Sequence, residues 1–228
     1  MPRRIAAALT ATALLLPLAA CTGDSTTTDE MSYRIDESVT SLVIGARAAS
    51  VEVMTGEGPV TVTEEHRYSR GRPTTAHEVA GTTLRLTESG CGDDDARCEV
   101  RYRIRMPAAM ALDITAQAGA VKVDGVAGDI RITTEAGAVE GRALTSDAVT
   151  VRTELGATSL EFAEAPALIS STSSMGAVDL RVPGTTTYAV DVRMPAGPGS
   201  VSVDRDPASA HRIEVRTEVG TVQIRPLP

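Results

Sequence analysis

One pattern of glycine and alternating side chains returns along most of this chain. A run of alternating apolar and polar residues leads to a polar corner, a Gly and a second alternating run, as in "RITTEAGAVEG" and "VRTEVGTVQI". Counted back from the Gly, apolar or small residues lie at the third, fifth and seventh positions. The six clearest copies are spaced 18 to 23 residues apart and contain Gly119, Gly137, Gly156, Gly176, Gly197 and Gly220. A seventh copy surrounds Gly56.

This frame predicts a repeated unit of two short strands joined at a glycine corner. Alternation places one face of each strand inward, and Gly tolerates a sharp corner. The constant frame lets equivalent side chains of successive units stack. The sequence therefore predicts an all-β fold, a β-solenoid of about six to seven two-stranded coils of about 20 residues each. The runner-up is an antiparallel β-sandwich, which also shows closely spaced strands but does not require one frame to repeat.

The segment between the first two copies predicts an insertion. Residues 64–107 contain two alternating runs, "TTLRLTESG" and "CEVRYRIRM", which we expect to pair as an antiparallel hairpin. Cys91 and Cys98 flank its acidic tip. In an exported chain these two residues predict a disulfide that closes the tip.

The N-terminus predicts export. Arg3 and Arg4 precede a short apolar run, which is followed by small residues, and this order is typical of a secretory signal peptide over residues 1–20. The segment "LAAC" at its end resembles the bacterial lipobox. That resemblance implies a lipid on Cys21 and anchoring to the outer face of the cell membrane. Residues 21–32 are small and polar and predict a flexible tether, which leaves residues 33–228 as one domain.

The net charge and the aromatic content of the chain limit the classes of partner that it can bind. The chain holds 30 acidic and 22 basic residues, a formal net charge of −8. This balance argues against nucleic acid as a partner. With no Trp and one Phe, stacking platforms for bases or sugars are not expected.

Three groups of residues could carry chemistry, and each has a simpler reading. Consecutive carboxylates at the hairpin tip could hold a cation or be solvated. Three glutamates two positions before a corner Gly could form an acid–base pair or a wet corner. The histidines are scattered, and no zinc, phosphate-loop or nucleotide pattern appears. We therefore predict no catalytic residue, no metal and no cofactor; the residues weighed are Asp93, Asp94 and Asp95; Glu135, Glu154 and Glu218; and His66, His77 and His211, the last near Asp206 and Ser209.

The outward positions of the repeat carry Thr, Arg and acidic residues in columns. They predict a flat polar surface, which could bind an extended partner or keep the domain soluble.

The segments "GAVKVDGVAGDIRITTEAGAVEG", "TSSMGAVDLRVPG" and "HRIEVRTEVGTVQI" resemble a bacterial family labelled putative adhesins, common among actinobacterial lipoproteins. The resemblance lies in strand rhythm and glycines, and it implies a β-solenoid-like domain without assigning functional residues. The leading hypothesis is a non-enzymatic, lipid-anchored envelope protein that binds a protein or glycan partner. The alternatives are an envelope sensor or accessory subunit of a membrane partner, and a polysaccharide-acting enzyme.

Overall fold

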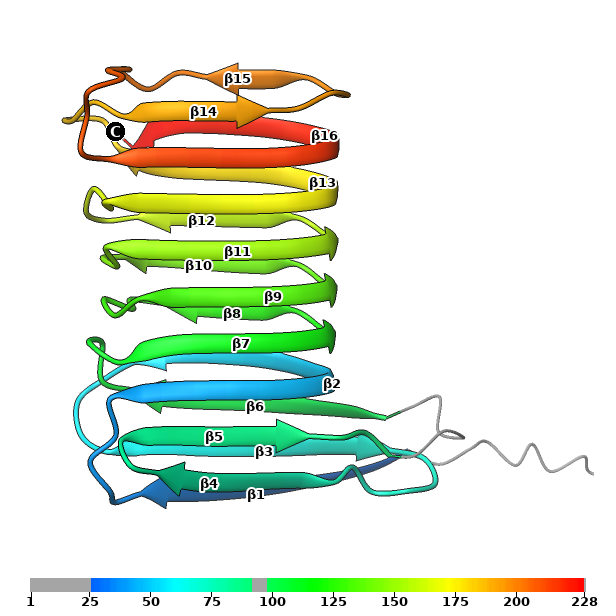
Figure 1. Ribbon diagram of the computed structural model, residues 1–228. Coiled ribbons are helices and arrows are strands. Elements are labelled where there is room, and N and C mark those ends of the chain that lie inside the picture. The colour runs from blue at the N-terminus through cyan, green and yellow to red at the C-terminus, as the bar shows by residue number, and fades with distance from the viewer. Residues whose placement is uncertain (1–25, 92–97, 228) are drawn as a thin grey trace, which may run out of the picture.

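The computed structural model describes residues 26–91 and 98–227 (Figure 1). The predicted signal peptide, Cys21 and the acidic tip at residues 93–95 lie outside the described residues. Across the two described ranges, no helix has the length and apolar character needed to cross a membrane.

The described chain is built from strands, as the alternation predicts. Sixteen strands follow one another: β1 Thr27–Ile35, β2 Ser41–Thr55, β3 Val60–Tyr68, β4 Thr75–Ala80, β5 Thr83–Glu88, β6 Glu99–Met106, β7 Ala111–Ala118, β8 Val121–Asp124, β9 Ile130–Ala136, β10 Val139–Leu144, β11 Ala148–Leu155, β12 Thr158–Phe162, β13 Leu168–Pro183, β14 Ala189–Arg193, β15 Gly199–Val201 and β16 Arg212–Leu227. The N-terminal strand changes one predicted boundary, because residues 27–32 of the expected tether pair with β3 as part of β1.

Eight of these strands pair side by side into a closed ring in which every pairing is parallel. The order around the ring is β2, β7, β9, β11, β13, β12, β10, β8 and back to β2. The ring closes because β2 and β13 continue through a bend, so that the two halves of each strand pair with different neighbours. The other eight strands lie outside the ring, stacked at its two ends in Figure 1.

The predicted β-solenoid of two-stranded coils is therefore wrong. The closed ring makes the fold a parallel eight-stranded barrel with further strands outside it, flattened into two rows that face each other. The antiparallel sandwich is wrong as well, since the ring pairings are parallel. An alternating run looks the same in sequence whether its strand stops at a corner or continues through it, so the repeat does not reveal this closure.

The predicted hairpin between β5 and β6 is also absent from the described pairings. β5 pairs with the first half of β2, and β6 pairs with its second half. Each also has an antiparallel partner, β4 for β5 and β3 for β6. The Cys91–Cys98 disulfide is confirmed, with Cα atoms 5.7 Å apart, but it lies in the connection that crosses from one row to the other.

Six of the predicted corner glycines lie in one column, where the chain bends from one row into the other. The N–H of Gly137 donates to the carbonyl of Leu155 at 2.9 Å, and Gly156 donates to Met175 at 3.0 Å. A Cβ atom on Gly156 would overlap the carbonyl oxygen of Gly137. Successive layers therefore approach too closely at the bend for a side chain.

Gly56 does not belong to this column, and its predicted position is wrong. The equivalent place is held by Ala49, whose carbonyl a Cβ atom on Gly119 would overlap. The seventh copy of the repeat is β2 itself, in which Leu42 pairs with Leu112 and Val51 pairs with Val121. The pattern around Gly56 has the right alternation, but its glycine lies seven residues after Ala49, which holds the corner of this copy.

The core lies between the two rows. Inward side chains from both rows are buried and pack as one cluster, which includes Leu42, Ile44, Val51, Val53, Leu112, Ile114, Ile132, Val149, Val151, Leu160, Phe162, Ile169, Leu180, Ile213, Val215 and Ile224. The outward positions face solvent, so the two broad sides of the barrel are available for binding.

Candidate functional site

One broad side of the barrel is a flat polar surface, here called the front face. It consists of the outward side chains of β7, β9, β11 and the first half of β13. They form two columns in strict register: Asp113, Arg131, Thr150 and Ser170, then Thr115, Thr133, Arg152 and Thr172. Neighbouring members are one strand apart, about 4.8 Å. The front face therefore presents hydroxyl and charged groups at a regular spacing.

The front face keeps its charged groups available. On this side, the ion pairs among the described residues lie in β14 and β16, namely Arg193 with Asp191, and Arg212 and Arg216 with Glu214. A shallow hollow of about 190 Å³ runs along the start of the front-face strands, and Asp113, Arg131 and Thr150 contribute to its lining. Charges free of intramolecular partners can pair with a ligand at a smaller desolvation cost than charges that must first be separated.

The opposite side, here called the back face, differs in this respect. Three ion pairs join its layers: Arg225 with Asp179 at 2.6 Å, Arg181 with Glu161 at 3.4 Å and Lys122 with Glu140 at 4.0 Å. These exposed pairs contribute little to stability individually. A ligand that bound one of these charges would first have to separate it from its partner.

The predicted glutamate column lies at the bend between the two faces. Glu135, Glu154 and Glu218 are exposed there. Beside them, Leu155, Met175 and Val219 are more than half exposed. The carboxylates are solvated and open to water, in agreement with the wet-corner reading.

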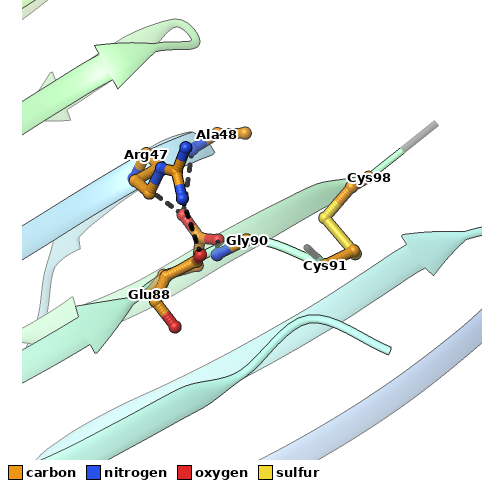
Figure 2. Close-up of a disulfide and its surroundings, with 7 residues drawn as sticks. Arg47, Ala48, Glu88, Gly90, Cys91 and Cys98 are labelled. Atoms are coloured by element: carbon orange, nitrogen blue, oxygen red, sulfur yellow. Dashed lines mark hydrogen bonds between the residues drawn. A yellow bond between two sulfur atoms is a disulfide. The ribbon is translucent and has the colours of Figure 1, made fainter. Parts of the chain in front are cut away.

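Glu88 closes the bend of β2 where the glycine column ends (Figure 2). Its carboxylate accepts hydrogen bonds from the backbone N–H groups of Arg47 at 2.8 Å and Ala48 at 2.9 Å, and it also accepts one from Gly90. In the glycine layers, the N–H groups at the bend bond to the carbonyls of the next layer. Glu88 supplies that acceptor where the chain instead leaves the stack toward the Cys91–Cys98 disulfide.

A buried polar cluster lies inside the stack near its β1 end. Glu64 and His66 are each about 2% exposed. The Glu64 carboxylate accepts a hydrogen bond from the hydroxyl of Tyr33 at 2.6 Å and lies 2.9 Å from His66 Nε2. Tyr33 stacks on His77 with ring centroids 4.3 Å apart. Within the described structure, the Tyr102 hydroxyl and His66 Nδ1 have no hydrogen-bond partner.

Nothing in the predicted fold brings Glu64, His66 and Tyr33 together. The signal was present, because alternation in "VTVTEEHRY" puts Glu64 and His66 on the same inward face as Val60 and Val62. A carboxylate and an imidazole two residues apart on a buried face are expected to pair.

Burial raises the pKa of three tyrosine hydroxyls, those of Tyr33, Tyr102 and Tyr188. Burial raises the pKa of Tyr188 to about 12 from an ordinary value of 10.0. Burial, then the Glu64 carboxylate, also raises the pKa of Tyr33 and of Tyr102. The folded state therefore holds these protons more tightly than the unfolded chain does.

We expect the protein to lose stability as the pH rises from about 10 to 12. The stabilisation is complete below the ordinary tyrosine pKa, because both states are then protonated, and it falls as the unfolded chain ionises first. Phenolate absorbance and the β-sheet circular dichroism signal, followed together, should change in one transition. Ionisation of all four tyrosines near pH 10 with the sheet signal intact would contradict this expectation.

The remaining histidine, His211, lies near Asp206 and Ser209 in sequence, and the structure shows what each of these side chains contacts. His211 Nδ1 lies 2.9 Å from the carbonyl of Pro166. The Ser209 hydroxyl donates to the carbonyl of Thr187, and the Asp206 carboxylate accepts from the N–H of Ala208. The side chains of Asp206, Ser209 and His211 thus bond to backbone groups.

Comparison with known proteins gives structural neighbours only. No family model matches the chain, and no curated protein matches its sequence. A crystal structure described as a putative cell adhesion protein from Clostridium sporogenes has a TM-score of 0.57 and 12% identity over 88% of this chain and all of that one. A putative adhesin from Bacteroides fragilis has a TM-score of 0.42 and 14% identity over 90% of this chain and 99% of that one. At these identities the first likeness establishes a shared fold.

Proposed function

We propose that this chain is a non-enzymatic, adhesin-like protein of the cell envelope that binds a partner through its front face. The observation that supports the proposal is the front face itself, where hydroxyl and charged side chains repeat in register and, among the residues that the structure describes, the ion pairs of this side lie outside these columns. Such a surface suits an extended partner whose own groups repeat.

The shared fold supports the same function. The Clostridium sporogenes protein, which has this fold along its whole length, is described as a putative cell adhesion protein. The proposed export and lipid on Cys21 would hold the domain at the outer face of the membrane. The partner is a surface protein or a glycan; the acidic balance of the chain disfavours nucleic acid.

The test is crosslinking and capture of the partner from intact cells by the full chain. We expect Thr115→Lys, which places a long cation in the front face, to reduce capture at least several-fold. Ser159→Lys is the matched control, because Ser159 is an exposed outward residue of the back face. Equal capture by the two variants would overturn the assignment to the front face.

The anchor is tested separately. Cys21→Ala should move the protein from the membrane fraction to the soluble exported fraction while its capture of the partner persists in solution. Retention of this variant in the membrane fraction would count against the lipid anchor. Recovery of one membrane protein as the sole partner would favour an accessory subunit over an adhesin.

A further inference from the structure

The strand β14 forms one end of its row. It pairs in parallel with β16, and among the described residues its opposite edge is covered only at Tyr188. There the Tyr188 N–H donates to the carbonyl of Asp204 at 2.9 Å, and the Asp206 N–H donates to the carbonyl of Tyr188 at 3.1 Å. From Val190 onward the edge is open, and it ends at Pro195, which has no N–H.

The direction of each backbone group along this edge follows from one hydrogen bond. The N–H of Ala189 donates to the carbonyl of His211 at 2.8 Å, so Ala189 and every second residue after it direct their backbone groups toward β16. The N–H and C=O groups of Val190 and Val192 therefore point to the open edge.

Val190, Val192 and Met194, the residue that follows β14, leave apolar surface uncovered. Their side chains pack against the core but are only partly buried, as is that of Val201 in β15. In the layer beneath, Ile213 and Val215 pair with Val190 and Val192 and are 0% exposed. An edge with free backbone groups and partly exposed apolar side chains is a template for a further strand.

We propose that this edge pairs with the β14 edge of a second copy of the chain, antiparallel and centred on Val192. In this register Val192 forms a hydrogen-bonded pair with its own counterpart, and Val190 lies opposite Met194 of the other copy, the residue that directly follows β14. The outward charges match as well: within each copy Arg193 pairs with Asp191 at 3.2 Å, and in the dimer each Asp191 also lies opposite Arg193 of the other copy, so the two pairs join into one group of alternating charges.

Charge selects this register over its neighbours. Centring on Asp191 would place Asp191 against Asp191, and centring on Arg193 would place Arg193 against Arg193. Like charges directly opposite each other destabilise a pair of strands. The order Val-Asp-Val-Arg-Met is therefore self-complementary in one antiparallel register, and the contact closes as a two-fold dimer.

Charge exchange tests this dimer, with the molecular mass in solution measured by light scattering or sedimentation. Asp191 and Arg193 are exposed, so substitutions there should leave the fold intact, and unchanged circular dichroism verifies that. We expect the full chain to dimerise reversibly. Arg193→Asp and Asp191→Arg should each weaken dimerisation roughly tenfold or more, because opposite charges become like charges.

A double variant and a mixture of the two single variants test the charge pairing further. The double exchange Asp191→Arg/Arg193→Asp should restore the dimer, and an equimolar mixture of the two single variants should form a mixed dimer. Val192→Pro removes an N–H that points away from β16, so it should abolish dimerisation while preserving the sheet signal. A monomeric full chain, single variants that dimerise normally, or open polymers instead of a dimer would each overturn the proposal.

Discussion

Replacing Gly156 with alanine is expected to lower the free energy of unfolding by about 3 kcal/mol or more. A Cβ atom there would overlap the carbonyl oxygen of Gly137 in the adjacent layer. Its φ of 151° adds strain for any residue with a side chain. Relief requires neighbouring layers to separate at the bend, which breaks main-chain hydrogen bonds such as that from Gly156 to Met175. Denaturant unfolding followed by circular dichroism measures the loss.

Gly45→Ala is the matched control for this prediction. Gly45 lies in β2, and a Cβ atom there would meet no atom within 4 Å. Restricting the unfolded chain at such a position stabilises a protein by roughly 0.4–1 kcal/mol. Equal destabilisation by the two alanines would show that the column tolerates side chains and that the close approach of layers has no energetic weight.

Glu88→Ala is expected to cost about 2–5 kcal/mol. The substitution removes the acceptor for the N–H groups of Arg47 and Ala48, and both would remain inside the bend without a partner. The disulfide should persist, because Cys91 and Cys98 are joined beyond the bend. Thermal or denaturant unfolding under non-reducing conditions measures the effect without contribution from thiol exchange.

Two further variants serve as comparisons for Glu88→Ala. Glu88→Gln keeps one carbonyl oxygen as acceptor and should fall between the native chain and Glu88→Ala. Glu78→Ala removes an exposed carboxylate from β4 and should change stability by less than about 0.5 kcal/mol. If Glu88→Ala behaves like Glu78→Ala, the bend of β2 does not depend on the carboxylate.

The strands themselves could be predicted from the sequence because alternation is a local property. Ile130 and Ile132 face inward and Arg131 faces outward in β9, as the repeat indicates. The Cys91–Cys98 disulfide followed from the number and position of cysteines. The frame also indicated that the later glycines hold equivalent places.

The ring closure and the position of the seventh copy are non-local and could not be obtained in this way. Nothing in the sequence near Ala49 or Gly176 states that β2 and β13 pair on both sides of their bends. The sequence pattern was aligned on Gly56 because the other six copies have a glycine at the corner. In the structure the corner of this copy is Ala49, which lies at the end of the column, where its bend does not stack on a further glycine.

Some features of the candidate site could also be predicted from the sequence, and others depend on which strands pair. The front-face columns could be predicted because they share the alternation of the core. The Glu64–Tyr33 contact joins β3 to β1 across 31 residues, and only the antiparallel pairing of these strands brings the two side chains together. The open edge of β14 depends on which strand lies beside it, and the order of β14 and β16 is not encoded in their alternation.

That order has a consequence for how the molecule is assembled during synthesis. β16 leaves the ribosome after β14 and β15, yet it lies between these two strands and β13. The growing polypeptide can add β7 to β13 in turn, but β14 and β15 have no strand to pair with until the 16-residue β16 follows them. β14 and β15 therefore join the sheet only after β16 has been made, and a chain that stops before residue 212 would leave this edge of β13 unpaired.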